Sequence, residues 1–293
     1  MSTSYTNMQG KVCIVTGANS GIGKATALGL AQMGATVVMV CRNQIRGEEA
    51  QNEIKEKSGN GAVDLMLADL ASLASIRQLA ENIHRRYQQV HVLINNAGVA
   101  NLTRRETIDG FEMEFAVNYL APFLLTHLLL DKLKASTPAR IVNVSSNSQK
   151  SGYIKIDNLQ SEKKYMRAYG QSKLALVLFT YELTRLLQGT GVTANCLHPG
   201  FVATNIGQNG VGSVGRSVIK LISRLGISAE EGAKTSIYLA SSPKIEGITG
   251  KYFVQSIPVR SAPISYDELL QRQLWEETTK LVNLPANLNV WDQ

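Results

Sequence analysis

Thr16-Gly-Ala-Asn-Ser-Gly-Ile-Gly23 lies between an apolar stretch, 12–15, and an amphipathic stretch that follows it. A strand, a glycine-rich turn and a helix in this order form the arrangement that binds a dinucleotide in an α/β sheet. We expect Gly17 to allow the tight turn, Gly21 to let the backbone approach the phosphates, and Gly23 to allow close packing of the helix. Free amides at the start of the helix would then bind the pyrophosphate.

A second feature is the pair Tyr169 and Lys173, which share one face of a helix candidate because they lie four residues apart. An ordinary tyrosine has a pKa of about 10 and donates protons poorly at neutral pH. We expect the Lys173 ammonium to favour the phenolate and so to lower the pKa of Tyr169. Taken alone, the pair fits an exposed helix surface better. With the glycine turn upstream, a proton donor for hydride transfer to or from a carbonyl is the better interpretation.

Short apolar stretches alternate with amphipathic ones along the chain, which has no internal repeat and no Pro/Ser-rich linker. This alternation predicts an α/β fold: a single doubly wound, Rossmann-type parallel sheet over residues 1–293, with helices on both faces. We expect strands at 12–16, 36–41, 64–68, 92–95, 140–145, 192–198 and 251–253. We expect helices at 23–33, 45–58, 73–87, 111–133, 168–187 and 229–240.

Two segments depart from this alternation. An insertion at about 203–228 follows a strand end, where ligands bind in such sheets. We interpret its Gly/Ser-rich part, 207–227, as a mobile lid over the substrate, with a loose surface insertion as the alternative. The tail, about 254–293, has apolar side chains near helical spacing, which predict a packed helix and leave a dimer contact or a peripheral membrane contact open. The side chains at this spacing are Leu270, Leu274, Thr278 and Leu281, with Trp275 alongside.

The composition excludes several classes of function. The net charge is +7, but the Lys and Arg residues are dispersed, so nucleic-acid binding is not favoured. The three cysteines and four histidines show no metal-ligand spacing, and the odd number of cysteines favours reduced thiols. The first nine residues are polar, and the most apolar stretch, 120–130, is too short to span a bilayer. We therefore expect a soluble, cytoplasmic protein without a transmembrane segment or a metal.

From about residue 10 to residue 252, the chain resembles short-chain dehydrogenases/reductases. The resemblance rests on four motifs in the order of that superfamily: Thr16–Gly23 with G-x-x-x-G-x-G spacing, Asn95-Asn-Ala-Gly98, Tyr169-x-x-x-Lys173 and Pro199-Gly200. Segments 158–162, 168–175, 198–200, 230–233, 247–253 and 274–275 are similar to its retinol dehydrogenase-like branch. The resemblance implies an oxidoreductase that interconverts an alcohol with an aldehyde or ketone. It also implies an apolar substrate, such as retinal, a lipid aldehyde or a steroid, and relatives are often homo-oligomers.

The resemblance also assigns cofactor contacts. For the phosphate turn they are Gly17, Asn19, Ser20, Gly21, Ile22 and Gly23. For the adenine they are Asp69 and Leu70, and for the wall beside its ribose Asn95, Ala97 and Gly98. On the nicotinamide side they are Tyr169 and Lys173, with Pro199, Gly200, Val202 and Thr204 around the carboxamide.

The end of the second strand indicates which cofactor binds. An NAD site usually has an Asp or Glu there for the ribose hydroxyls, but this strand ends Val40-Cys-Arg-Asn43. Arg42 can pair with a 2′-phosphate through its planar guanidinium, and Asn19 and Asn43 can add hydrogen bonds. The alternative is that Arg42 is only a solvated residue at the strand end. We expect NADP(H).

The catalytic set needs two more members. Ser146, with Ser145 as the alternative, follows a strand and matches the serine that orients the carbonyl. Asn118 matches the residue that links Lys173 to solvent through a water, although a buried Asn inside an apolar helix also fits a structural role. Two other functions stay open: a non-catalytic NADP-sensing or scaffold protein, and a double-bond reductase of a pigment-like substrate.

Overall fold

The computed structural model describes residues 7–161, 168–200 and 227–284. Within them, one sheet has the strand order β3-β2-β1-β4-β5-β6-β7-β8. Neighbouring strands are parallel except β7 and β8, which are antiparallel. The strands are β1 (Val12–Thr16), β2 (Thr36–Cys41), β3 (Val63–Leu67), β4 (Val92–Asn95), β5 (Ala139–Val144), β6 (Val192–His198), β7 (Tyr252–Val254) and β8 (Ile257–Val259).

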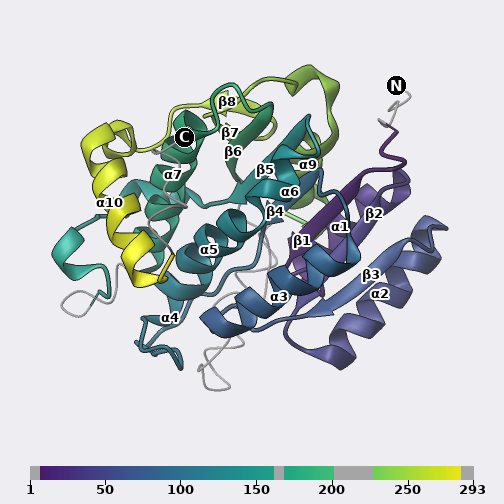
Figure 1. Ribbon diagram of the computed structural model, residues 1–293, viewed down its shortest axis with the longest axis horizontal. Helices are drawn as coiled ribbons and strands as arrows, with labels where there is room; N and C mark the ends of the chain where they lie inside the picture. The colour runs from purple at the N-terminus through teal and green to yellow at the C-terminus, as the bar shows by residue number, and fades with distance from the viewer. Residues whose placement is uncertain (1–6, 162–167, 201–226, 285–293) are drawn as a thin grey trace.

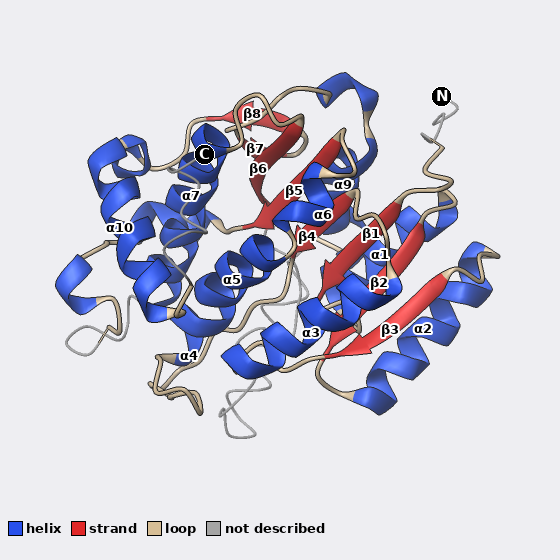
Figure 2. Cartoon of the chain, viewed as in Figure 1, coloured by secondary structure: helices blue, strands red, loops and turns tan. Residues whose placement is uncertain are grey.

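Helices cover both faces of this sheet (Figure 1). One apolar cluster contains side chains of α1 (Gly21–Gln32), α2 (Gln44–Ser58) and α9 (Ala229–Ser241). The other contains side chains of α3 (Leu73–Arg86), α4 (Met113–Phe115), α5 (Ala121–Leu128), α6 (Leu130–Lys134), α7 (Ala168–Leu186) and α10 (Glu268–Leu281). The helix and strand layers are distinguished by colour in Figure 2. The predicted α/β fold, a mostly parallel Rossmann-type sheet with helices on both faces, is confirmed.

The predicted strands are confirmed with end shifts of one residue, but the single helix predicted at 111–133 is wrong. That stretch is divided into α4, a π-helical turn (Ala116–Leu120), α5 and α6. The first helix begins later than predicted, at Met113, because the Glu112 carboxylate caps α4. This carboxylate accepts hydrogen bonds from the amides of Glu114 and Phe115. Pro122 has no amide hydrogen for the carbonyl four residues earlier, so a regular α-helical ladder cannot continue through the π turn.

Strand β8 was absent from the prediction. It pairs with β7 through a two-residue turn, Gln255-Ser256, in which both residues have positive φ (49° and 63°). Such turns usually contain Asn or Gly, so the sequence carries no hairpin signal here. Tertiary contact stabilises the turn, because Thr235 Oγ1 on α9 accepts a hydrogen bond from the Ser256 amide at 3.1 Å.

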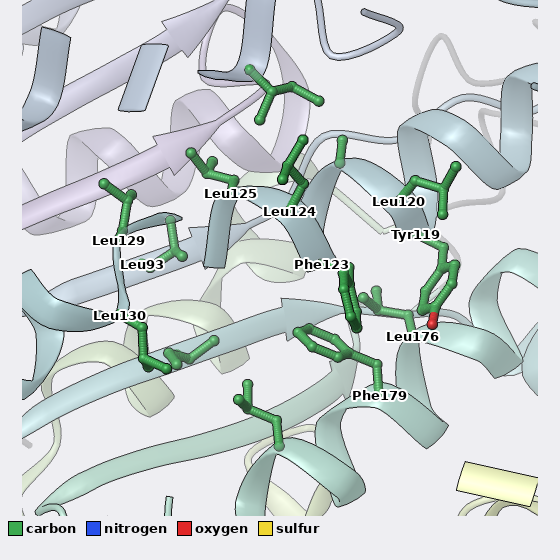
Figure 3. Packing of buried hydrophobic residues seen from close by; sticks show 14 of the residues in the cluster. Leu93, Tyr119, Leu120, Phe123, Leu124, Leu125, Leu129, Leu130, Leu176 and Phe179 are labelled. Carbon is green, nitrogen blue, oxygen red and sulfur yellow. The ribbon is translucent and has the colours of Figure 1, made fainter. Parts of the chain in front are cut away.

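The predicted C-terminal helix is confirmed as a packed element. α10 begins after Asp267, whose carboxylate caps it by accepting from the Leu270 amide at 3.0 Å. Its Trp275 is 2% exposed and lies 5.0 Å from Phe123 of α5 and 5.8 Å from Phe179 of α7, ring centroid to ring centroid. Figure 3 shows Phe123 and Phe179 side by side in this core. The tail therefore covers the outer surface of α5 and α7.

Three further properties bear on function. Cys13, Cys41 and Cys196 are buried and free, as predicted for reduced thiols. In the described ranges, no helix has both the length and the apolar character needed to cross a membrane. Those ranges also contain no group of three or more side chains placed to hold a metal ion.

Candidate active site

A cleft of about 470 Å³ runs along the carboxyl ends of the parallel strands, from Arg42 at one end to Tyr169 at the other. Ligands bind at this edge in open α/β sheets. Most residues that the sequence predicts to contact a cofactor line it: Gly17, Asn19, Ser20, Gly21, Ile22, Gly23, Arg42, Asn43, Asp69, Leu70, Ala97, Gly98, Tyr169, Lys173 and Pro199. The cleft is long and lined from several strands, so it suits an extended ligand.

The glycine turn between β1 and α1 forms one wall of the cleft. Gly17 and Gly21 have φ of +68° and +53°, values that residues with a Cβ adopt only at a cost in conformational energy. A Cβ on Gly23 would lie 2.3 Å from Gly17 O and 2.4 Å from Asn96 Nδ2. Gly23 therefore lets the start of α1 approach the turn itself and Asn96 at the end of β4, where packing of the helix on a strand was predicted. Ser20 caps α1 without a side-chain hydrogen bond to the helix.

Thr16 and Asn96, which the sequence analysis missed, join this turn to the end of β4. Thr16 Oγ1 accepts hydrogen bonds from the amides of Asn96 and Ala97, both at 3.0 Å. Asn96 Nδ2 donates to Thr16 O at 2.8 Å. Asn96 lines the cleft, whereas the predicted Asn95 does not. The Asn95 side chain points into the interior and donates to Asn143 Oδ1 at 2.8 Å, so its predicted place beside a ribose is corrected.

Arg42 lies at the far end of the cleft with a side chain that is 73% exposed. Its Nη1 is 4.0 Å from Asp69 Oδ1, a loose ion pair of two exposed groups that contributes little stability. Asn43 Oδ1 caps α2 by accepting from the Arg46 amide at 2.9 Å, so this side chain already has a structural role. Arg46 also lines the cleft and adds a second cation that sequence reasoning missed.

Asn118 lies in the π-helical turn and is fully buried. Its side-chain amide makes three hydrogen bonds, two with Val99 and one with Ser172. Its Oδ1 accepts from the Val99 amide at 2.7 Å. Its Nδ2 donates to Val99 O at 2.9 Å and to Ser172 Oγ at 3.0 Å. A Cβ on Gly98 would lie 3.3 Å from Asn118 Oδ1 and 3.4 Å from Lys173 Nζ. The side chains of Asn118 and Lys173 thus flank the same small residue.

Lys173 extends from α7 toward the end of β5 and is only 3% exposed. Its Nζ donates to Val144 O at 2.9 Å. Burial disfavours the charged form and lowers the pKa of Lys173 to about 8. The ammonium is therefore held in place by a backbone carbonyl and loses its proton more readily than an exposed lysine.

The pKa of Tyr169 differs from the expectation. The Lys173 Nζ lies 5.8 Å from the centroid of the Tyr169 ring. The pKa of Tyr169 is nevertheless raised, chiefly because burial disfavours the phenolate. A hydrogen bond with Ser146 lowers it, and the nearby Glu114 carboxylate raises it further. The prediction of a lowered pKa is wrong for this structure, because burial of the Tyr169 phenol outweighs the hydrogen bond that lowers its pKa.

The two serines after β5 have different partners. Ser145 is buried and its Oγ donates to Lys173 O at 2.9 Å, a contact that joins β5 to α7. Ser146 Oγ hydrogen-bonds with Tyr169 and accepts from the Ser148 amide at 3.2 Å. Of the two, Ser146 has the hydroxyl that meets the tyrosine. The structure therefore brings Ser146, Tyr169 and Lys173 together, with Asn118 close to Lys173. Of these four, Tyr169 and Lys173 line the cleft, as does Ser145, whereas Ser146 and Asn118 lie behind its wall.

The remaining predicted residues lie where the chain leaves β6. Pro199 lines the cleft. Gly200 has φ of +92°, and a Cβ on this residue would lie only 2.6 Å from Ile227 Cδ1. Val202, Thr204 and the predicted lid at 207–227 lie outside the described residues except for Ile227. Met113, Val99 and Ala100 line the cleft near Tyr169 and were missed, because nothing in their local pattern separates them from ordinary core residues.

Comparisons with known proteins found relatives both by sequence and by fold. Residues 11–211 match the family model described as short chain dehydrogenase. Human retinol dehydrogenase 13 is 46% identical over 290 residues, which cover 97% of this chain and 88% of that protein. The crystal structure of an uncharacterised Mycobacterium paratuberculosis protein is 31% identical, with a TM-score of 0.78 over 96% of each chain. The NADP complex of RhlG from Pseudomonas aeruginosa is 26% identical, with a TM-score of 0.67 over 86% of this chain and 97% of that one.

Proposed function

Since the chain belongs to the short-chain dehydrogenase family, we propose that it is an NADP(H)-dependent oxidoreductase that reduces an apolar aldehyde or ketone to its alcohol and can run in reverse. The observation that carries the proposal is the meeting of Ser146, Tyr169 and Lys173 beside Asn118, with Tyr169 and Lys173 lining the cleft. A hydroxyl, a proton donor and a buried ammonium in this arrangement suit polarisation and protonation of a carbonyl oxygen.

NADP(H) is favoured over NAD(H) by the charge at the other end of the cleft. Arg42 and Arg46 both line it near the end of β2, and no acid follows that strand directly. A 2′-phosphate is dianionic near neutral pH and binds a guanidinium through two parallel hydrogen bonds. The solved RhlG structure contains NADP on the same fold, which supports this choice. Asp69, which is predicted to contact the adenine, lies 4.0 Å from Arg42 and would also orient its guanidinium.

The residues of this chain divide the work as follows. A bound NADPH supplies the hydride. Ser146 Oγ orients the carbonyl oxygen, and Tyr169 donates the proton to it as negative charge develops. Because the pKa of Tyr169 is raised, its hydroxyl remains protonated at neutral pH and is ready to act as the acid. Lys173 holds the ribose and stabilises the phenolate left behind, and Asn118 holds the wall of the cleft beside it.

Retinoids and related apolar molecules are the favoured substrates. The relative at 46% identity is a retinol dehydrogenase, and the apolar side chains of Met113, Val99 and Ala100 are among those that line the cleft. Six further apolar residues could line a substrate pocket. One of them, Leu102, is 60% exposed. The others lie outside the described residues: Phe201, Ile206, Val211, Val214 and Ile219. The substrate class therefore rests on the relative and on the cleft walls.

The first experiment measures NADPH oxidation against a panel of aldehydes and ketones that includes all-trans-retinal, with NADH in parallel. Tyr169→Phe should abolish turnover while NADPH binding stays nearly intact. Tyr238→Phe is the matched control, because Tyr238 lies on α9 on the opposite face of the sheet.

The outcomes separate the candidate functions. NADPH-dependent turnover that disappears in Tyr169→Phe supports the reductase. Tight NADPH binding without turnover by the wild-type protein would favour the non-catalytic sensor or scaffold, or a double-bond reductase, and pigment-like substrates would then be tested.

A further inference from the structure

Glu114 is a buried carboxylate beside the cleft that the proposed mechanism does not use. It lies on α4, is 2% exposed, and one of its oxygens accepts a short hydrogen bond from the Asn101 amide. Four residues later, Asn118 binds the amide and the carbonyl of Val99. Glu114 and Asn118 therefore hold the same loop at two points, and Gly98, Val99 and Ala100 of this loop form a wall of the cleft.

The helix α4, which carries Glu114, also packs against α7, which carries Tyr169, and the neighbouring Met113 lines the cleft together with Tyr169. Among the described residues, the charge that raises the pKa of Tyr169 is that of Glu114. In the part of the chain that the structure describes, the other titratable groups near the tyrosine are Lys173 on α7 and Tyr252 on β7. A fixed negative charge near a phenol favours its protonated form.

We propose that Glu114 is a positioning residue of the active site, which holds the loop Val99–Asn101 against Asn118 and places a negative charge beside Tyr169. The inference rests on the proposed reductase function and deepens it, since a tyrosine kept protonated is suited to donate a proton to a carbonyl. By keeping Tyr169 protonated, the charge of Glu114 favours reduction over oxidation as the pH rises.

Two substitutions separate the contact from the charge. Glu114→Gln keeps an oxygen that can accept from the Asn101 amide but removes the charge. Glu114→Asp keeps the charge but is one methylene too short to reach Asn101. Glu112→Gln is the matched control: Glu112 is a buried carboxylate two residues away, its charge lies beside Arg104, and its loss should weaken the cap of α4.

The experiment is a pH titration of ¹³C-labelled tyrosine rings by NMR on the full chain, with and without NADP⁺, in which Tyr169→Phe identifies the Tyr169 signal. Alongside it, the pH profile of alcohol oxidation is measured. In Glu114→Gln the Tyr169 midpoint and the acid limb of the oxidation profile should both move to lower pH. In Glu114→Asp the midpoint should stay high while kcat falls, and in Glu112→Gln the midpoint should stay at the wild-type value.

A Tyr169 midpoint in Glu114→Gln equal to that of the wild type would overturn the inference, as would an equal shift in Glu112→Gln. The ring titration needs no substrate. A wild-type protein that turns over no carbonyl or alcohol would therefore defeat the proposed function while leaving the role of Glu114 tested by the midpoint alone.

Discussion

Asn118 Nδ2 donates to Ser172 Oγ at 3.0 Å, and Ser172 Oγ in turn donates to Tyr169 O at 2.9 Å. The hydroxyl of Ser172 thus connects the π-helical turn to the first turn of α7, which carries the tyrosine. Both side chains are fully buried, so neither can exchange this partner for water. The relationship explains how a residue 51 positions away in sequence is kept in register with Tyr169.

Ser172→Ala should therefore reduce activity without removing any group that touches the substrate. Loss of the acceptor leaves the Asn118 amide with one fewer partner, which costs about 1–3 kcal/mol when the group stays buried. We expect kcat to fall roughly tenfold with little change in the dissociation constant of NADPH. Steady-state kinetics and fluorescence titration of NADPH test this. An unchanged kcat would show that Asn118 is positioned by Val99 alone.

The two serines after β5 should respond differently to substitution. Ser146→Ala removes the hydroxyl that meets Tyr169 and should lower kcat by roughly 100-fold, in the range found when one oxyanion contact is removed. Ser145→Ala removes a hydrogen bond to the backbone of α7 and should mainly lower stability, by about 1 kcal/mol. Kinetics and urea unfolding of both variants distinguish these effects. The reverse pattern would assign the catalytic role to Ser145.

Arg42→Asp tests the cofactor choice. An acid at the end of β2 would repel a 2′-phosphate and accept hydrogen bonds from ribose hydroxyls. We expect KM for NADPH to rise by roughly 100-fold, since a charge-assisted pair contributes about 1.5–3 kcal/mol, while KM for NADH changes far less. Initial rates with both cofactors give the answer. Equal changes for the two would reject the assignment of Arg42 to the phosphate.

His127 should make the protein sensitive to acid. It is buried between Phe123 and Trp275, and burial lowers its pKa from 6.5 to about 4. Between these two values the unfolded chain binds more protons than the folded one, so the free energy of unfolding falls as the pH drops from about 6.5 to 4. His127→Leu should lose much of this dependence. Urea unfolding at several pH values tests it, and parallel curves for both proteins would refute the prediction.

Trp275→Ala tests whether the tail is part of the core. The indole is packed against α5 and α7, and removing a buried aromatic side chain usually costs about 3–5 kcal/mol. We expect thermal unfolding at a clearly lower temperature, while the exposed Leu269→Ala on the same helix should change it little. Similar unfolding temperatures for both variants would mean that α10 contributes little to the fold.

The layer architecture follows from the amino-acid sequence alone, because alternating apolar and amphipathic stretches allow few arrangements. The glycine turn does too, because Gly17 and Gly21 need positive φ. It also placed Tyr169 and Lys173 on one helix face, since helical spacing is local. The tertiary structure decided what local patterns cannot encode. Burial raised the pKa of Tyr169 although Lys173 lies one helical turn away, and Thr235 of α9 stabilised the Gln255-Ser256 turn before β8.

The inward turn of Asn95 also depends on a partner far away in sequence, Asn143. The position of the buried Asn118 side chain depends on Val99 and Ser172 in the same way. Desolvation and hydrogen bonding across the fold are sums over such distant neighbours. The desolvation and the hydrogen bonds of a side chain are therefore set only once folding has brought those neighbours together.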